Sequence, residues 1–189
     1  MRSASLILAS ASPQRRAILE QIGVGFEIRV PAVDELSAGP AAEVAVENAY
    51  RKAASIAPAE LPVLGVDTVV SLGREIFGKP RDAEHAAAML EALAGRRHCV
   101  ISGVCLIDGD RVQTAAAQTA VEFRALDAPT IEAYVRTGEW EGRAGAYAIQ
   151  GRGATLVARI EGDYLNVVGL PVSTLVDMAP GLIADGAGW

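Results

Sequence analysis

Residues 98–124 contain the clearest β-hairpin pattern in this chain, and this pattern constrains the fold more than any other feature. Two strand-like runs, 98–107 and 111–124, are separated only by the turn sequence Asp108-Gly109-Asp110. Such a turn between two strand-forming runs predicts antiparallel neighbours. Elsewhere, predicted strands alternate with predicted helices, a pattern typical of α/β proteins. Together the two signals predict an α/β fold with a mixed twisted sheet flanked by helices.

Six further strands and five helices are expected around this hairpin. The strands are predicted at 6–9, 26–30, 62–72, 75–77, 156–160 and 164–168. The helices are predicted at 13–22, 41–56, 83–93, 129–136 and from Pro171 onward, with Ser12 and Asp82 as N-caps. The glycine-rich residues 142–153 predict a structured loop, and residues 184–189 predict a frayed tail. The length and the absence of a linker or repeat favour a single domain over residues 1–189.

The overall charge argues against nucleic acid as a partner. The net charge is −6, whereas proteins that hold a polyphosphate backbone show a basic face. A small anionic ligand is compatible with this charge, because it needs only a local cluster of cations. No segment approaches the roughly 20 apolar residues of a membrane span, and the run at 6–9 is too short for a signal peptide. Cys99 and Cys105 are expected to be free thiols, so we expect a cytoplasmic protein without membrane contact.

The serine-rich segment 10–16 has the composition of an anion site. It joins a predicted strand to a helix N-terminus, where unpaired backbone amides and the helix dipole attract negative charge. Ser10 and Ser12 add hydroxyl groups, and Arg15 and Arg16 add positive charge. Taken alone, the segment favours the plainer interpretation, a capped helix that carries two solvated arginines.

Asp67 is the most unusual residue, because it lies in the middle of an apolar predicted strand. A carboxylate in such a place must be paired with a cation, bind a metal or have a shifted pKa, and each state is costly to maintain. These costs favour a functional role, and the alternative is a salt bridge to a buried cation such as Lys79. The neighbouring Thr68 is either a hydrogen-bonding partner or a strand former that faces the other way.

Further candidates lie on the helix at 41–56 and on the loop before it. Lys52 is four residues from Asn48 and therefore shares its helix face, although such pairs are usually surface decoration. Asp34 and Glu35 follow a strand, and carboxylate oxygens suit Mg²⁺ or Mn²⁺, which bind through one or two carboxylates plus substrate phosphates. The sequence has no cluster of histidine and cysteine with zinc spacing.

Several blocks of sequence resemble one known family. The blocks are residues 8–15 (LASASPQR), 52–53 (KA), 65–70 (GVDTVV), 78–80 (GKP), 144–151 (AGAYAIQG), 160–164 (IEGDY) and 168–171 (VGLP). In this order, over residues 5 to about 175, they resemble the Maf family of nucleotide pyrophosphatases.

The resemblance implies an α/β fold like that of the inosine-triphosphate pyrophosphatases, usually in a homodimer, with a cleft for a nucleoside triphosphate and a divalent metal, Mg²⁺ or Mn²⁺. By resemblance, Asp67 is the catalytic proton acceptor and, with Glu35, a metal ligand. The residues matched to substrate binding are Ser10, Ser12, Arg15, Lys52, Lys79 and Gln150.

The resemblance also bears on the base of the substrate. Thr68 and Gln150 look like the branch that hydrolyses dTTP and UTP, and a glutamine amide can both donate to and accept from a pyrimidine edge. Gln14 stands where that branch commonly has arginine, so we expect Gln14 to affect base choice. The alternatives are a pyrophosphatase for 7-methyl-GTP or a broad range of nucleotides, and a non-catalytic nucleotide-binding regulator of septum formation.

Overall fold

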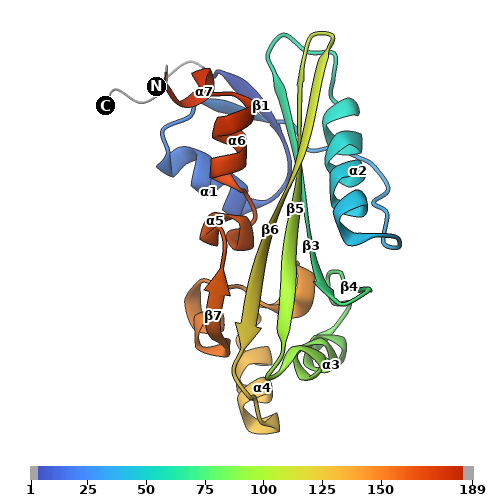
Figure 1. The fold of residues 1–189 in the computed structure, drawn as a ribbon, viewed down its shortest axis with the longest axis vertical. Coiled ribbons are helices and arrows are strands. Elements are labelled where there is room, and N and C mark those ends of the chain that lie inside the picture. The colour runs from blue at the N-terminus through green and yellow to red at the C-terminus, as the bar shows by residue number, and fades with distance from the viewer. Residues whose placement is uncertain (1–3, 185–189) are drawn as a thin grey trace.

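The computed structural model describes residues 4–184, and the strands within this range form one mixed sheet of seven strands (Figure 1). They are β1 (Leu6–Ala9), β2 (Phe26–Ile28), β3 (Val63–Leu72), β4 (Glu75–Phe77), β5 (Arg97–Asp108), β6 (Arg111–Phe123) and β7 (Val157–Glu161). Their order is β2-β1-β3-β5-β6-β7, with β4 beside β3. β1 runs parallel to β2 and β3, whereas β3, β5, β6 and β7 are antiparallel in succession. The predicted mixed sheet and the predicted β5–β6 hairpin are confirmed.

The long strand β3 has two different neighbours along one of its edges. Its first half pairs with β1 as far as Ala9 opposite Gly65, and its last residues pair with β4 from Val70 onward. Residues 66–69 therefore lie in the interval between the end of β1 and the start of the β4 pairing. This interval contains Asp67 and Thr68, so both lie beside the chain segment that leaves β1.

Helices cover both faces of the sheet (Figure 1). The α-helices are α1 (Pro13–Gln21), α2 (Ala41–Ala54), α3 (Ala83–Leu93), α4 (Ala128–Val135), α5 (Tyr164–Val168), α6 (Val172–Met178) and α7 (Gly181–Ala184). α2 packs on one face of β3 and β5, and α1, α5 and α6 enclose a core with Leu8, Leu64 and Leu170 on the opposite face. None of the helices among residues 4–184 combines the length and apolar character that a membrane span requires.

A second core fills the other end of the sheet. α3, α4 and two short 3₁₀ helices, η1 (Ala144–Ala146) and η2 (Gly151–Leu156), contribute to a cluster that includes Leu90, Phe123 and Tyr147. The predicted structured loop at 142–153 therefore contains η1 and the start of η2. Its conformation carries the chain from α4 back to the sheet.

Two glycines allow α2 to lie unusually close to the sheet. A Cβ atom on Gly65 would be 2.1 Å from the carbonyl oxygen of Ala49, and a Cβ atom on Gly103 would be 2.2 Å from that of Ala45. Only residues without a side chain fit under the helix at these two points. The close approach brings the polar residues of α2 within reach of β3.

One predicted strand is wrong. Residues 164–168 form the helix α5, because the side chain of Asp163 accepts hydrogen bonds from the backbone N–H groups of Leu165 and Asn166 and so caps a helix. The β-forming composition of this short run is overridden by the cap. α6 begins one residue after Pro171, as predicted within the usual boundary error. The predicted frayed tail lies outside the described residues from position 185 onward.

Candidate active site

A cleft of about 420 Å³ opens where β1 ends beside the middle of β3. This volume is typical of small-molecule sites, which range over about 300–1,000 Å³. Ten of the residues singled out from the sequence, which come from six separate segments of chain, line this cleft: Ser10, Ser12, Gln14, Arg15, Glu35, Lys52, Asp67, Thr68, Lys79 and Gln150. Their individual roles remain predictions.

The turn after β1 and the start of α1 form one wall of the cleft. Ser12 is the N-cap of α1, as predicted, and Pro13 is the first helical residue. The Ser12 hydroxyl donates a hydrogen bond to the side chain of Gln14 at 3.1 Å. Ser10 Oγ accepts a hydrogen bond from the Ser12 backbone N–H at 3.1 Å, which leaves the Ser10 hydroxyl hydrogen available as a donor.

Arg15 is buried and joins three parts of the cleft. Its Nε donates to the carbonyl oxygen of Gly169 at 2.9 Å, and its two terminal nitrogens donate to Ser10 Oγ and Thr68 Oγ1, each at 3.1 Å. A guanidinium has five N–H donors, so two remain for a ligand. Burial lowers the pKa of Arg15, an effect opposed by the charge of Asp67, yet an arginine stays protonated in proteins.

The second predicted arginine of this segment points elsewhere. Arg16 is exposed, pairs with Glu20 on the surface of α1 and is not among the residues that line the cleft. The expectation that both arginines add charge to one anion site is therefore wrong for Arg16. Helical geometry separates adjacent residues by about 100°, so Arg15 and Arg16 face different directions.

Asp67 is buried with only 6% of its surface exposed, and both of its carboxylate oxygens are hydrogen-bonded by residues of α2. Lys52 Nζ lies 2.5 Å from Oδ1, and Asn48 Nδ2 donates to Oδ2 at 3.0 Å. The alternative that Lys79 pairs with Asp67 is wrong. Lys79 has a side chain 61% exposed, and its Nζ lies 4.0 Å from Glu35 instead.

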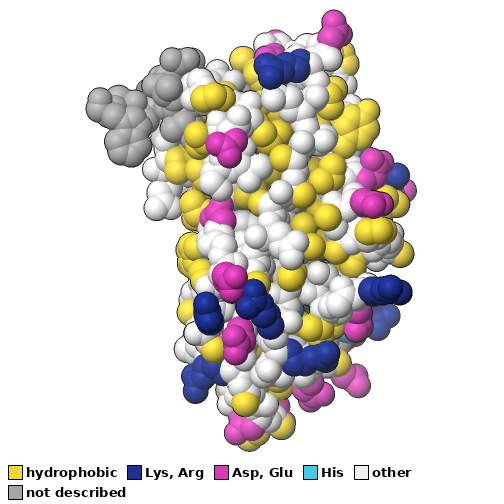
Figure 2. Space-filling model, in the orientation of Figure 1, with side chains coloured by type: hydrophobic (Ala, Val, Ile, Leu, Met, Phe, Trp, Pro, Cys, Tyr) yellow, Lys and Arg dark blue, Asp and Glu magenta, His cyan; other side chains and the backbone are white. Residues whose placement is uncertain are grey.

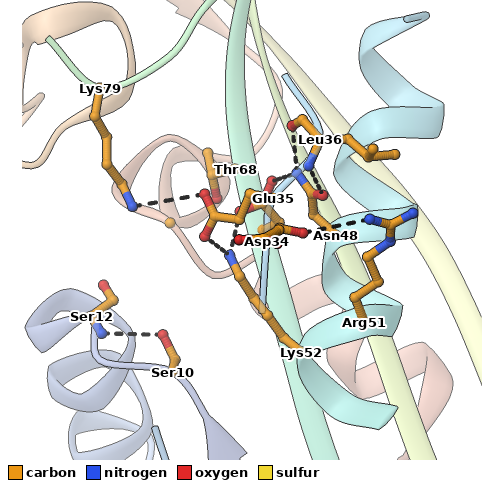
Figure 3. A network of polar contacts seen from close by, with 12 residues as sticks. Ser10, Ser12, Asp34, Glu35, Leu36, Asn48, Arg51, Lys52, Thr68 and Lys79 are labelled. Atoms are coloured by element: carbon orange, nitrogen blue, oxygen red, sulfur yellow. Dashed lines mark hydrogen bonds and ion pairs between the residues drawn. The ribbon is translucent and has the colours of Figure 1, made fainter. Parts of the chain in front are cut away.

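Lys52 contacts two carboxylates, of which that of Glu35 is labelled in Figure 3. Its ammonium group is 2.7 Å from Glu35 Oε1 and 2.5 Å from Asp67 Oδ1. A single cation therefore already sits within reach of both carboxylates, and oxygen donors of this kind are what Mg²⁺ and Mn²⁺ prefer. Glu35 and Asp67 could supply oxygens to a divalent ion. Further ligands would have to come from the substrate and water, since no group of three or more acidic, histidine or cysteine side chains placed to hold a metal is found in residues 4–184.

Apolar side chains also line the cleft, among them Val30, Pro31, Tyr147, Ile149 and Val168, together with the polar Gln150. Apolar side chains with a few polar groups are typical of small-molecule sites and suit the flat ring of a base. Tyr147, Ile149 and Val168 lie in blocks that carry the family resemblance, but the sequence assigned none of these apolar residues a role.

Tyr147 is held in place by a buried histidine. His98 Nε2 lies 2.9 Å from the Tyr147 hydroxyl, and both rings pack edge-to-face against Phe123. Burial lowers the pKa of His98 to about 4, so this ring is neutral at physiological pH. His98 itself is not among the residues that line the cleft.

The fold and the cleft together define a class: an α/β protein with a cleft between the end of an inner strand, a helix N-terminus and buried charges, an arrangement that suits a small anionic ligand. Comparison with known proteins makes this class specific. The chain belongs to the Maf-like protein family, whose model matches residues 5–181.

Curated relatives with the name dTTP/UTP pyrophosphatase cover most of the chain. The protein of Symbiobacterium thermophilum is 47% identical over 178 residues, which are 92% of this chain and 91% of the relative. That of Gloeobacter violaceus is also 47% identical, over 92% of this chain and 93% of its own. That of Pyrococcus furiosus is 42% identical over 180 residues, again 92% of this chain and 93% of the relative.

Proposed function

We propose that this protein hydrolyses dTTP and UTP to the nucleoside monophosphate and pyrophosphate. The observation that carries the proposal is the buried Asp67 carboxylate beside a cleft lined with cations. The names of relatives at 42–47% identity over about nine-tenths of the chain support the same activity and the same substrates.

The triphosphate is held at the charged end of the cleft. Arg15 has two free N–H donors there, and Lys79 reaches the cleft from its exposed position. Ser10 and the helix N-terminus at Ser12 supply neutral donors. Lys52 leaves its two carboxylates and moves to the phosphates, because the substrate offers it a larger negative charge. Positioning and charge compensation supply most of the acceleration in phosphoryl chemistry.

Asp67 acts as the general base. Its carboxylate takes a proton from a water molecule whose oxygen forms a bond to the α-phosphorus. The bond from the α-phosphorus to the bridging oxygen breaks, and pyrophosphate leaves with the electron pair. Glu35 and Asp67 would hold a Mg²⁺ or Mn²⁺ ion, which when bound neutralises charge that builds up on the phosphate oxygens.

We assign selection of the base to three polar side chains that line the cleft. Thr68 and Gln150 are the residues that we assign to recognition of uracil and thymine. Gln14, which accepts a hydrogen bond from Ser12, replaces the arginine expected by resemblance and reduces the positive charge at this wall. We expect this change to affect the ratio of activities toward dTTP and UTP.

The direct test is to replace Asp67 by asparagine, which keeps the shape and removes the base. We expect Asp67→Asn to stay folded and to lose activity by about 10²- to 10⁴-fold, the usual contribution of a general base. Asp127→Asn, at the exposed N-cap of α4, is the matched control and keeps full activity, since asparagine also caps helices. Near-normal pyrophosphate release by Asp67→Asn removes Asp67 from the mechanism.

The substrate is tested by pyrophosphate release from dTTP, UTP, CTP, 7-methyl-GTP and pseudouridine triphosphate, with Mg²⁺ and with Mn²⁺. Cleavage of dTTP and UTP is expected. Cleavage of 7-methyl-GTP alone contradicts the substrate assignment. Tight nucleotide binding without any pyrophosphate release supports the non-catalytic septum regulator instead.

We propose a homodimer in the cytoplasm, without nucleic acid or membrane partners. β7 pairs only with the last residues of β6, from Ala120, so within residues 4–184 no strand lies beside residues 111–119 on that edge. An open edge pairs readily with a second copy about a two-fold axis, and few charged side chains lie over this part of the sheet (Figure 2). A monomer in sedimentation at every concentration refutes the dimer.

The proposed location in the cytoplasm rests on the two cysteines. The free thiols of Cys99 and Cys105 suit a reducing compartment.

A further inference from the structure

Asn48 is a buried amide that connects three parts of the candidate active site. It lies on α2 with 2% of its surface exposed. Its Oδ1 accepts a hydrogen bond from the Leu36 backbone N–H at 2.7 Å, and its Nδ2 donates to the Leu36 carbonyl oxygen at 3.0 Å. The same Nδ2 donates to Asp67 Oδ2 at 3.0 Å. The amide oxygen and both hydrogens of the amide nitrogen therefore have hydrogen-bond partners.

This pattern fixes the orientation of the amide. The oxygen must face the Leu36 N–H, and the two hydrogens of the nitrogen serve the Leu36 carbonyl and the carboxylate of Asp67. The reversed orientation would place the amide oxygen against a carboxylate and the amide nitrogen against a donor. An aspartate in this position would keep the acceptor and lose both donors.

The segment that Asn48 holds is otherwise exposed. Between β2 and α2, residues 29–40 form neither helix nor strand, and residues 34–40 are exposed. Arg51 makes only a long 3.5 Å contact to the Asp34 carbonyl oxygen in this segment. The loop thus has two short polar attachments to α2: the ion pair of Glu35 with Lys52 at 2.7 Å, and the two hydrogen bonds of Asn48 to the Leu36 backbone (Figure 3). The Asn48 bonds are the ones that hold the backbone itself.

We propose that Asn48 is a positioning residue that sets the Glu35 carboxylate at a fixed place relative to Asp67. By binding Oδ2, it also leaves Oδ1 as the oxygen that faces Lys52 and Glu35. Oδ1 is thus the oxygen left to accept the proton. The expected effects on kcat rest on the proposed function, whereas the attachment of the loop by Asn48 does not depend on it.

Two variants separate the contacts of Asn48. Asn48→Leu removes all three hydrogen bonds with little change in volume, and Asn48→Asp keeps the acceptor for the Leu36 N–H. We expect kcat to fall by about 10- to 100-fold in both, the usual cost of losing a residue that orients a metal ligand. The KM for dTTP should change by less than about threefold, because the phosphate-binding side chains stay in place, and the Mg²⁺ concentration for half-maximal rate should rise by about tenfold.

Hydrogen exchange of the Leu36 amide gives a readout that does not depend on activity. We expect this amide to exchange at least about tenfold faster in Asn48→Leu than in the wild type, and within about threefold of the wild type in Asn48→Asp. If the wild-type protein releases no pyrophosphate, the proposed function fails while this measurement still decides whether Asn48 holds the loop. Unchanged exchange in Asn48→Leu overturns the inference.

Asn166 provides the matched control. Its buried amide donates to the Val100 carbonyl oxygen and to Thr119 Oγ1, and so makes no hydrogen bond to Asp67, Lys52, Glu35 or Leu36. We expect Asn166→Leu to lower the melting temperature and to keep kcat, per folded molecule, within about twofold of the wild type. If the Asn48 variants behave in the same way, Asn48 has only a structural role and the positioning role is overturned.

Discussion

The close contact between α2 and β3 gives the sharpest prediction, because a single methyl group tests it. In Gly65→Ala the new Cβ would lie 2.1 Å from the Ala49 carbonyl oxygen and 2.8 Å from the Ala53 backbone nitrogen. Ordinary contacts begin at 3.4 Å, and the obstacles are helix backbone atoms, which no side-chain rotation can remove. The helix must therefore retreat by about 1 Å, as overpacked cores do.

This retreat has two consequences of known size. Overpacking costs about 1–3 kcal/mol, which for a chain of this length lowers the melting temperature by about 2–12 °C. The Lys52–Asp67 and Asn48–Asp67 distances, 2.5 and 3.0 Å, would grow beyond good hydrogen-bond range. A misplacement of about 1 Å at a catalytic group costs about 10²-fold in rate, so kcat should fall by this factor.

The assay combines thermal unfolding with pyrophosphate release by the folded protein. The control is Gly109→Ala at the tip of the β5–β6 hairpin, where φ is +55° and no heavy atom lies within 4 Å of the new Cβ. Its left-handed backbone costs about 1–2 kcal/mol without moving α2, so stability falls and kcat does not. If Gly65→Ala loses stability and keeps kcat, the contact does not set the geometry of the site, and the reasoning is refuted.

Two further predictions concern a buried base, His98, and a buried cation, Arg15. His98, with its pKa lowered to about 4, binds its proton less readily in the folded than in the unfolded chain. The folded state is therefore more stable by about 3 kcal/mol above pH 6.5, where His98 is neutral, and this stability is lost as the pH falls toward 4. Urea unfolding of His98→Gln should show a flatter pH dependence over this window. An equal slope in both proteins contradicts this assignment. Arg15→Lys keeps the charge and loses the separate donors to Gly169 and Thr68, so the KM for dTTP should rise by about tenfold or more, and a wild-type KM would exclude Arg15 from phosphate binding.

The parts of the fold that depend on local sequence were predictable. The β5–β6 hairpin follows from its turn residues, and the helix caps at Ser12 and Asp82 follow from side chains adjacent to the helix start. The helix α5 was predicted as a strand because its five residues are too few for periodicity to decide. There the capping bond of Asp163 overrides composition.

The sequence also identified candidate residues for the site, but it could not predict which of them contact one another. Asp67 stood out because a carboxylate interrupts an apolar strand. The choice between Lys52 and Lys79 as its partner depends on how closely α2 approaches β3, which two glycines decide through tertiary packing. The Arg15–Gly169 hydrogen bond joins positions 154 apart in sequence, and local sequence patterns cannot predict contacts over such a separation. Asn48 shared a helix face with Lys52, and this was the signal that could have identified it.

The lysine between the two acidic side chains gives the cleft its own counter-ion. The Lys52 ammonium lies within 2.7 Å of one oxygen of each carboxylate, so the two acids share a single positive charge. In the proposed reaction, binding of a polyphosphate is then an exchange of ions, in which the ammonium passes from the acids to the incoming anion. The phosphates must compete with two carboxylates for this ammonium, so the strength of nucleotide binding depends on how readily the acids release it.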